Sequence, residues 1–197
     1  MSVTPATATS DSAAADISRA SIEAAATRIA PFIIETPLIE SPRLNDKLGI
    51  RLLVKAECLQ HTGSFKLRGA SNAVWSLDDT VKHVVAFSSG NHAQGVARAA
   101  ASRGLQATIV MPKDSPAGKI EGTKAYGGTV ILYDRYTEAR EEIGADLATR
   151  KQAHLINPFD DARVIAGQGT VGLEIATQAA AKNLTPDAIV CCCGGGG

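Results

Sequence analysis

A lysine at the start of a predicted helix is the residue of this sequence with the clearest chemical potential. Lys66 follows a Ser- and Gly-containing stretch, residues 61–65, and opens the helical pattern of residues 66–76. The positive field and the backbone N–H groups of a helix N-terminus lower the pKa of an amine, which favours its neutral, nucleophilic form. Lys66 could therefore form a Schiff base with a carbonyl compound. The alternative is an ordinary solvated lysine in a first helical turn.

A second loop with binding chemistry lies between an apolar segment and a predicted helix. Its residues are Ser88, Ser89, Gly90, Asn91 and His92. They bring hydroxyl, amide and backbone donors to a helix N-terminus, a cluster that suits a carboxylate or a phenolate oxygen. The competing interpretation is an N-cap made by one of the serines, with the amide in solvent and the histidine packed in the first turn instead of acting as a base.

A run of four glycines follows the last apolar segment: Gly194, Gly195, Gly196 and Gly197. Because consecutive glycines let several backbone N–H groups converge, we predict that this run holds a phosphate. A flexible linker is the alternative, although linkers usually mix Ser with Gly and do not directly follow a buried strand. No Gly-Lys-Ser/Thr sequence ends the run, so the phosphate need not belong to a nucleotide.

The elements that must position these loops alternate along the chain. Apolar, β-branched runs predict strands at residues 51–56, 83–87, 107–111, 129–132 and 188–193, with a weak one at 154–156. Helical patterns predict helices at residues 18–30, 66–76, 91–103, 116–126, 138–151 and 169–182. Alternating strands and helices form parallel sheets, which bind ligands at the carboxyl ends of their strands. We therefore predict an α/β fold whose chemistry lies in the loops after the strands.

Composition narrows the class of protein. The chain has 197 residues, of which 45% are hydrophobic, enough for a substantial core. Its 20 Lys and Arg balance its 20 Asp and Glu, so we expect no nucleic-acid or membrane partner. No apolar run approaches the roughly 18 residues of a transmembrane helix, and residues 1–16 lack the pattern of a signal peptide. We predict a cytoplasmic protein in which residues 1–16 form a disordered tail.

The cysteines do not form a recognisable framework. Cys58 stands alone, and Cys191, Cys192 and Cys193 are consecutive, which suits neither a zinc site nor a set of disulfides. We expect all four to be reduced and buried, the last three in the strand at 188–193, and we predict no metal site.

The lysine, the Asn-containing loop and the glycine run together resemble one family. This is the group of pyridoxal-phosphate (PLP) enzymes that contains the threonine/serine dehydratases and serine racemases, with the tryptophan-synthase-like fold known as fold type II. The resemblance runs from about residue 17 to the end and rests on the motifs at residues 62–70, 88–94, 164–170 and 194–197. It implies two domains based on parallel sheets: a small one at 83–160 and a large one at 17–82 and 161–197.

The resemblance also implies roles for single residues. Lys66 becomes the Schiff-base lysine, Asn91 the partner of the cofactor's ring hydroxyl oxygen, and Gly194 to Gly197 the phosphate loop. Ser88, Ser89, Gly90 and His92 line the loop that binds the substrate carboxylate, and Ser89 matches the serine that racemases use opposite the lysine. Arg140 matches an arginine near the substrate, although its surroundings equally describe a solvated helix face. Arg68 has no implied role beyond a structural ion pair.

The implied reaction is the loss of water from a β-hydroxy amino acid such as L-threonine or L-serine, giving a 2-oxo acid and ammonia. Reprotonation by Ser89 from the opposite face would instead give a serine racemase, and a chain that acts only as a binding module is the third alternative. The resemblance implies a homo-oligomer. Because the family's fold continues beyond the glycine run, we expect these 197 residues alone to form an incomplete large domain without activity.

Overall fold

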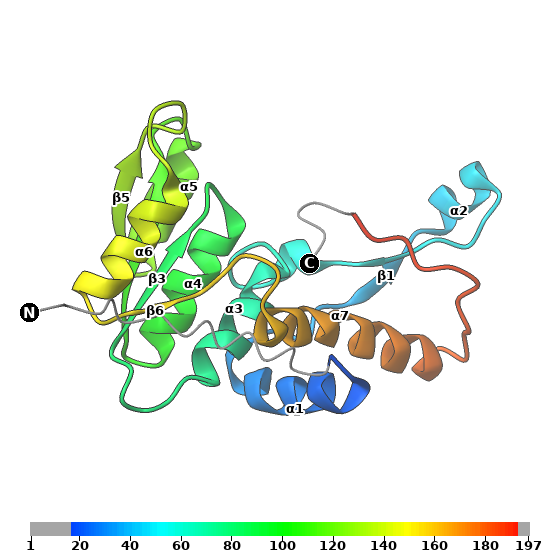
Figure 1. Cartoon of the computed structure of the whole chain (residues 1–197). Coiled ribbons are helices and arrows are strands. Elements are labelled where there is room, and N and C mark those ends of the chain that lie inside the picture. The colour runs from blue at the N-terminus through cyan, green and yellow to red at the C-terminus, as the bar shows by residue number, and fades with distance from the viewer. Residues whose placement is uncertain (1–16, 193–197) are drawn as a thin grey trace, which may run out of the picture.

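The computed structural model describes residues 17–192 of the chain. Figure 1 shows its helices and strands in space. The α-helices are α1 (Arg19–Ile29), α2 (Pro42–Leu48), α3 (Lys66–Trp75), α4 (Asn91–Ser102), α5 (Ala117–Ala125), α6 (Arg140–Arg150) and α7 (Ala162–Ala181). The strands are β1 (Leu38–Glu40), β2 (Leu53–Lys55), β3 (His83–Phe87), β4 (Gln106–Pro112), β5 (Thr129–Tyr133) and β6 (His154–Leu155), and two 3-10 turns are η1 (Ala30–Phe32) and η2 (Glu57–Leu59).

A four-stranded parallel sheet is the centre of one half of the molecule. Its strand order is β5-β4-β3-β6, with β3 fully buried between β4 and β6. The strand β3 reads His-Val-Val-Ala-Phe, a continuous apolar run of the kind that parallel sheets covered on both faces require. The predicted α/β class with a parallel sheet is therefore confirmed.

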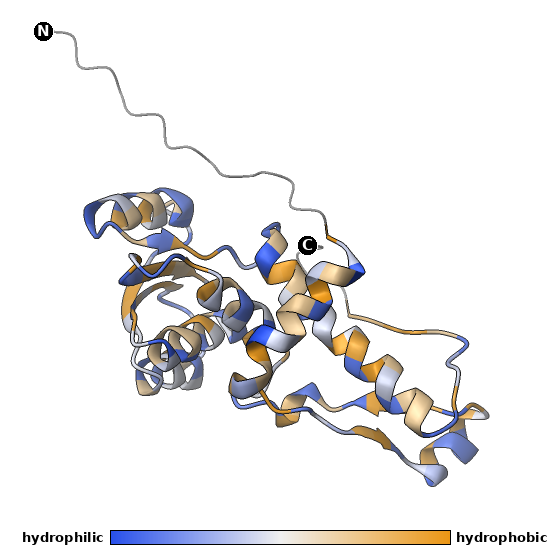
Figure 2. Cartoon of the chain, turned by 90° about the horizontal axis from the view of Figure 1, so that it is seen from below, coloured by the Kyte–Doolittle hydropathy of each residue, from blue (hydrophilic) through white to orange (hydrophobic). Residues whose placement is uncertain are grey.

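Helices cover the two faces of this sheet (Figure 1). On one face, α3, α4 and α5 pack over alternate side chains such as Val84 of β3 and Ile109 of β4. On the other face, α6 covers Phe87 and Val110, which point the opposite way because side chains alternate along a strand. Hydrophobic residues accordingly gather on the strands and on the inner sides of the helices (Figure 2).

Two glycines let α3 and α7 cross at very short range. A Cβ on Gly69 of α3 would lie 2.5 Å from the Gln168 side chain, and one on Gly167 of α7 would lie 2.6 Å from the Arg68 carbonyl oxygen. Atoms that close clash, so any larger residue would force the helices apart. These glycines explain part of the motifs at 62–70 and 164–170 in terms of packing.

The second sheet differs from the prediction. The predicted strand at 51–56 exists as β2, but it pairs antiparallel with β1, a strand that we did not predict, in register Leu38↔Lys55 to Glu40↔Leu53. The helix α2 lies between them and was also not predicted. Both elements are short, three and seven residues, so neither carries enough periodicity to be recognised.

The predicted strand at 188–193 is wrong for the residues that the structure describes. Residues 188–192 have no regular structure, and Val190 is 94% exposed. A strand needs a neighbouring strand to pair its backbone groups, and within residues 17–192 none lies beside this segment. Cys58, Cys191 and Cys192 are free, as predicted, but exposed instead of buried. Cys193 and residues 1–16 lie outside the described residues.

The remaining helices and strands agree with the prediction to within two residues, except that α7 begins at Ala162 and not near residue 169. Its N-cap is Asp161, whose carboxylate accepts hydrogen bonds from the backbone N–H groups of Arg163 and Val164. Gly167 and Gly169 lower helix propensity, so the sequence signal for the first turns of α7 is weak. Among residues 17–192, no helix has the length and apolarity that a membrane crossing requires.

Candidate active site

Lys66 and Asn91 occupy equivalent positions in two packed helices. Lys66 is the first residue of α3, and Asn91 is the first residue of α4, directly after β3. The helices approach closely because Gly95 has no side chain: a Cβ there would lie 3.2 Å from the Lys66 carbonyl oxygen. The fold therefore packs the start of α3 against the first turns of α4, so that the helices following the two predicted binding loops are in contact.

The amine of Lys66 is half-buried and has a weak partner. Its Nζ donates to the Pro158 carbonyl oxygen at 3.1 Å and lies 5.4 Å from the centre of the Phe65 ring. Burial lowers the pKa of Lys66, which increases the fraction of the neutral amine at a given pH. We predicted a lowered pKa from the helix N-terminus, and the structure gives the same direction through loss of solvent.

His92 is a packed histidine, held close to Lys66. Its Nε2 lies 3.3 Å from the Ile156 carbonyl oxygen, and its Nδ1 is buried without a partner among the described residues. Burial lowers the pKa of His92 to about 4, and the nearby charge of Lys66 acts in the same direction. The imidazole is therefore neutral at physiological pH and is a poor proton acceptor there.

Ser88, Ser89 and Gly90 form the turn between β3 and α4. Ser88 donates its backbone N–H to the Val110 carbonyl oxygen at 3.1 Å, and its Oγ accepts from the Gly90 N–H at 3.2 Å. Neither serine caps α4, because Gly90 is the N-cap residue and no side chain bonds to the helix end. The N-cap alternative is thus wrong, and first-turn N–H groups of α4 have no side-chain acceptor.

A cavity of about 310 Å³ opens beside this turn. Ser88, Ser89 and Arg140 all line it, together with Tyr133 and Arg135, which lie at and after the end of β5. Arg140 lies 5.3 Å from the centre of the Phe87 ring, and its Nε donates to Glu141 at 2.7 Å. The predicted Arg140 therefore does share one cavity with the two predicted serines.

The predicted residues form two neighbouring groups. Lys66, Asn91 and His92 lie at the starts of α3 and α4, whereas Ser88, Ser89 and Arg140 line the cavity; among the described residues, the cavity lining does not include Lys66 or Asn91. Gly194, Gly195, Gly196 and Gly197 lie outside the described residues, so the phosphate loop stays a prediction.

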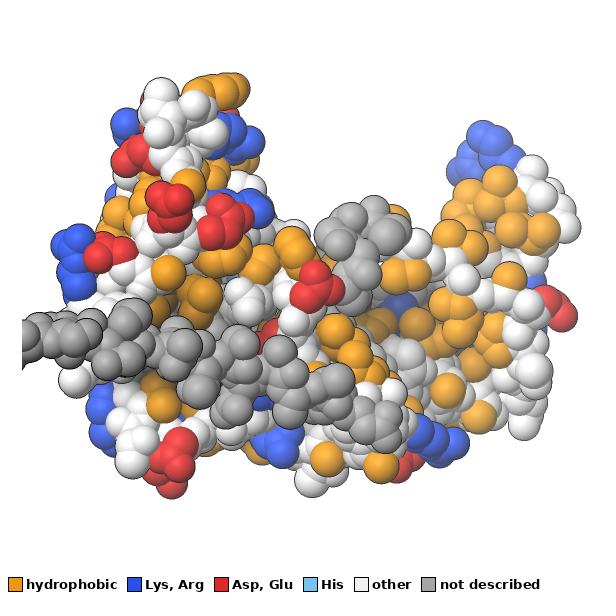
Figure 3. Space-filling model, in the orientation of Figure 1, with side chains coloured by type: hydrophobic (Ala, Val, Ile, Leu, Met, Phe, Trp, Pro, Cys, Tyr) orange, Lys and Arg blue, Asp and Glu red, His pale blue; other side chains and the backbone are white. Residues whose placement is uncertain are grey.

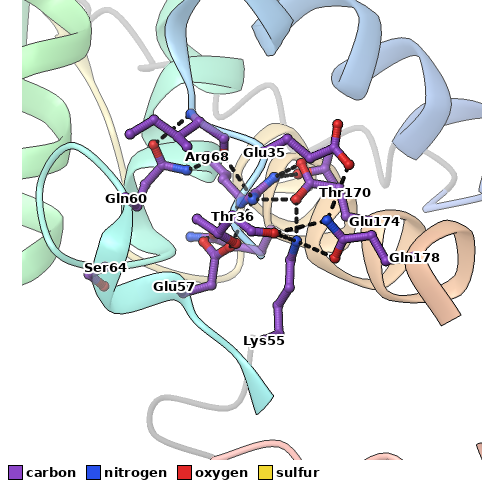
Figure 4. Close-up of polar contacts among 12 residues, drawn as sticks. Glu35, Thr36, Lys55, Glu57, Gln60, Ser64, Arg68, Thr170, Glu174 and Gln178 are labelled. Carbon is purple, nitrogen blue, oxygen red and sulfur yellow. Dashed lines mark hydrogen bonds and ion pairs between the residues drawn. The ribbon is translucent and has the colours of Figure 1, made fainter. Parts of the chain in front are cut away.

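Arg68 belongs to a buried network behind the site (Figure 4). Its fully buried guanidinium bonds to Glu57 at 2.8 Å and to Glu174 at 2.6 Å. Glu174 also accepts from Lys55 at 2.6 Å, and Thr170 of α7 lies 3.3 Å from the Arg68 Nη1. Burial alone would lower the pKa of Arg68, but the bonds to Glu57 and Glu174 outweigh it and raise that pKa. The expected ion pair of Arg68 is a two-carboxylate network.

Lys119 is a polar neighbour of the site that the sequence did not single out. It lies in the first turn of α5, and its Nζ donates to Asn91 Oδ1 at 2.5 Å and to Gln94 Oε1 at 3.3 Å. A signal was available, since residues 113–119 follow the carboxyl end of β4, the edge where ligands bind in parallel sheets. Lysines near helix starts are common, however, so composition alone does not distinguish this one.

The residues present fit the implied cofactor. A half-buried amine with a lowered pKa suits an aldehyde, and Asn91 has its oxygen occupied by Lys119, so its amide nitrogen is the group left to meet a ring oxygen. Lys66 would hold the aldehyde carbon and Asn91 the ring oxygen. PLP, when bound, would supply an electron sink at this edge of the sheet.

The known proteins to which this chain is similar belong to one family. The sequence profile described as "Pyridoxal-phosphate dependent enzyme" matches residues 29–197. The L-threo-3-hydroxyaspartate ammonia-lyase of Saccharomyces cerevisiae is 46% identical over 84% of this chain and 50% of that protein. The serine racemase of Schizosaccharomyces pombe is 40% identical over 84% of this chain and 51% of that protein.

Solved structures agree. The crystal structure of a T.th. threonine deaminase superposes with a TM-score of 0.80 and 48% identity, covering 86% of this chain and 54% of that chain. The chain thus spans about half the length of the relatives that it matches. The predicted fold type II class and the predicted cofactor are confirmed at the level of the family. This chain belongs to the family of pyridoxal-phosphate-dependent enzymes.

Proposed function

We propose that the protein eliminates water from a β-hydroxy amino acid and releases a 2-oxo acid and ammonia. The observation that carries this proposal is the half-buried Lys66 amine with its lowered pKa, bonded to the Pro158 carbonyl oxygen and near His92, the residue after Asn91. The relatives named as ammonia-lyase and threonine deaminase support the reaction type. The activity of the whole protein is inferred, since the chain spans half of those proteins.

In this proposal the residues at the starts of α3 and α4 have separate roles. Bound PLP supplies a sink for the negative charge left when the α-proton departs. The neutral amine of Lys66 accepts that proton, and the lowering of its pKa by burial favours this neutral form. Asn91 holds the ring oxygen, and Gly194, Gly195, Gly196 and Gly197 hold the phosphate. The neutral His92 keeps the space beside Lys66 free of a second charge.

The turn after β3 binds the substrate in this proposal. The hydroxyl groups of Ser88 and Ser89, together with backbone N–H groups of Gly90 and the start of α4, would donate hydrogen bonds to the α-carboxylate. The Ser89 hydroxyl could also return a proton to the opposite face of the substrate, which would make the protein a serine racemase. The position of Ser89 in the cavity favours this second candidate, as does the similarity to serine racemases.

The same cavity bears on the choice of substrate. Arg140 and Arg135 both line it, and a guanidinium binds a carboxylate in two parallel hydrogen bonds. The ion-pair partner of Arg140 is Glu141, its exposed neighbour in sequence, and a second substrate carboxylate can displace that partner. We therefore propose 3-hydroxyaspartate as a better substrate than threonine or serine. A cytoplasmic location and a homo-oligomeric assembly are further parts of the proposal that rest on the sequence and the resemblance.

Reduction with borohydride tests the role of Lys66. In the full-length protein loaded with PLP, it should attach the cofactor covalently to Lys66, and peptide mapping should find the label there. Lys66→Ala should abolish labelling and turnover, whereas Lys47→Ala on the exposed surface of α2 should change neither. Label on another lysine would refute the assignment.

Product analysis tests the reaction and the substrate. Ammonia and 2-oxo acid should form from L-threo-3-hydroxyaspartate, with smaller rates from L-threonine and L-serine. Arg140→Ala should lower kcat/KM for hydroxyaspartate about 10- to 100-fold, the loss expected for one charged hydrogen bond, while changing that for threonine little. Ser89→Ala should remove any interconversion of serine enantiomers. Synthesis of cysteine from O-acetylserine without ammonia from any β-hydroxy amino acid would overturn the proposal.

A further inference from the structure

Lys119 makes a short, direct contact with Asn91 of the candidate cofactor loop. Its Nζ donates to Asn91 Oδ1 at 2.5 Å, and it also reaches Gln94 Oε1 at 3.3 Å. Lys119 is half-buried on α5, whereas Asn91 and Gln94 lie one turn apart on α4. The contact therefore joins two helices that cover the same face of the sheet.

The chemistry of the contact fixes the direction of the Asn91 side chain. An ammonium group has three donors and no acceptor, so the side-chain amide must turn its oxygen toward Lys119. The nitrogen Nδ2 then points away, and within the described part of the chain it has no hydrogen-bond acceptor. A neutral asparagine alone could present either atom, since its oxygen and nitrogen ends have nearly the same shape.

The second partner holds Lys119 in place. Gln94 is 8% exposed and directs its oxygen toward the ammonium. Its amide nitrogen occupies the space that a side chain at residue 122 would need, and Gly122 leaves that space open. Lys119 is thus held by two amide oxygens, and among residues 17–192 no carboxylate pairs with it. Its full positive charge remains beside Asn91.

We propose that Lys119 is a positioning residue that orients Asn91 for the cofactor. With its oxygen held by Lys119, Asn91 can only donate, which is what the negatively charged ring oxygen of PLP needs. This inference rests on the proposed function in one respect, namely that Asn91 meets the ring oxygen.

Affinity for PLP measures this role without turnover. In the full-length apoprotein, the dissociation constant of PLP is titrated by visible absorption for the unsubstituted protein, Lys119→Met, Asn91→Ala and the double variant. Methionine keeps the apolar stem of lysine and removes the charge, so the fold should survive, which circular dichroism checks. Lys119→Met should weaken PLP binding about 10- to 100-fold, the loss of one charged hydrogen bond.

The double variant separates positioning from direct binding. Because Lys119 acts through Asn91, the double variant should bind PLP no more weakly than Asn91→Ala alone. Lys119→Arg, which keeps a donor, should recover most of the affinity and the position of the absorption maximum. Lys124→Met is the matched control: Lys124 lies on the same helix, is exposed and pairs with Glu121, so its loss should leave the affinity unchanged.

The results that would contradict the inference are distinct from those that would contradict the proposed function. If Lys119→Met binds PLP within twofold of the unsubstituted protein, Lys119 has no positioning role. If the losses of the two single variants multiply in the double variant, Lys119 contacts the cofactor itself and the inference is wrong. If the unsubstituted protein binds no PLP, or borohydride labels a lysine other than Lys66, the proposed function fails, and the inference fails with it.

Discussion

The two halves of the molecule bury different kinds of side chain. The sheet region, residues 83–160, has a core of apolar residues such as Val84, Ile109 and Met111 between its strands and helices. The Arg68 region, residues 17–82 and 161–192, adds residues such as Val74 and Val164 to that core, but it also buries the guanidinium of Arg68 against the part-buried carboxylates of Glu57 and Glu174. Apolar packing depends on shape, whereas a buried charge depends on its partners. Different kinds of substitution should therefore destabilise the two regions.

The surface supports the same contrast. Most of the large hydrophobic side chains that are exposed lie in the Arg68 region, for example Ile39 of β1, Leu48 of α2 and Val54 of β2. Figure 3 shows such side chains gathered around β1 and α2. Many large apolar side chains of this region stay in contact with water, and the Arg68 network adds charged contacts to its cohesion. Replacing a charged residue of the Arg68 network should lower the free energy of unfolding as much as a cavity in the apolar core does in the sheet region.

The largest effect is expected from removing the central charge. Arg68→Met leaves two part-buried carboxylates, of which Lys55 pairs with Glu174, and should lower the free energy of unfolding by about 3–5 kcal/mol. Denaturation in urea measures the loss, and hydrogen exchange of peptides from 162–181 should show it locally. The charge is responsible if adding Glu174→Gln restores part of the stability. Arg19→Met, in an exposed pair with Glu23, is the control and should change nothing measurable.

A cavity in the sheet region should lower the free energy of unfolding somewhat less. Ile109 is fully buried at the centre of the sheet, and Ile109→Ala should lower the free energy of unfolding by about 2–5 kcal/mol. Because the lost contacts are apolar, removing a carboxylate should restore none of this loss: adding Glu174→Gln to Ile109→Ala should not recover stability, unlike its addition to Arg68→Met. Equal recovery in both backgrounds would remove the distinction between the regions.

Acid should separate the two regions by the pH at which each weakens. Burial lowers the pKa of His92 from 6.5 to about 4, so unfolded chains bind a proton in this range and folded ones do not. The stability from neutral His92 is complete above pH 6.5 and is lost as the pH falls toward 4, by roughly 3 kcal/mol. Burial of Glu174 would raise its pKa, but Arg68 and Lys55 lower it below 4.5, so the stability that Glu174 contributes to the Arg68 region is lost only below that pH.

Urea denaturation between pH 7 and 3.5 tests this order. His92→Asn should remove much of the loss between pH 6.5 and 4, while His83 and His154, whose pKa values are also lowered by burial, keep part of it. Glu174→Gln should flatten only the part below pH 4.5. The idea fails if His92→Asn leaves the upper part of the profile unchanged.

The same contrast explains how much could be predicted from the sequence. The strands β3, β4 and β5 and the helices between them were predicted to within two residues, because a buried sheet demands continuous apolar runs that are visible locally. In the Arg68 region, β1 and α2 were missed and residues 188–192 were wrongly predicted as a strand. The partners of Arg68 lie 11 and 106 residues away, so no local pattern reveals them.

The site divides in the same way. Lys66, Asn91 and Ser89 could be proposed from the sequence because each lies in or directly after a Ser/Gly-rich turn at a helix start, a signal within about ten residues. Lys119 was not proposed, since its contact with Asn91 spans 28 residues of sequence. The start of α7 could not be predicted locally, because Gly167 lowers helix propensity and its close packing against α3 is visible only in the structure.

The smallest loss of stability is expected from replacing a left-handed glycine at a helix end, and it should be the same in both regions. Gly49 ends α2 with φ +67°, and Gly104 follows α4 with φ +73°; a Cβ at either position meets no atom within 4 Å. Alanine at either site should therefore cost only the strain of the left-handed backbone, about 1 kcal/mol in the free energy of unfolding. Gly118→Ala, in the first turn of α5 with similar open space and no positive φ, is the control and should stabilise slightly. Because this cost is local, costs for Gly49→Ala and Gly104→Ala that differ by more than about 0.5 kcal/mol would mean that the surroundings contribute even where no atom is in contact.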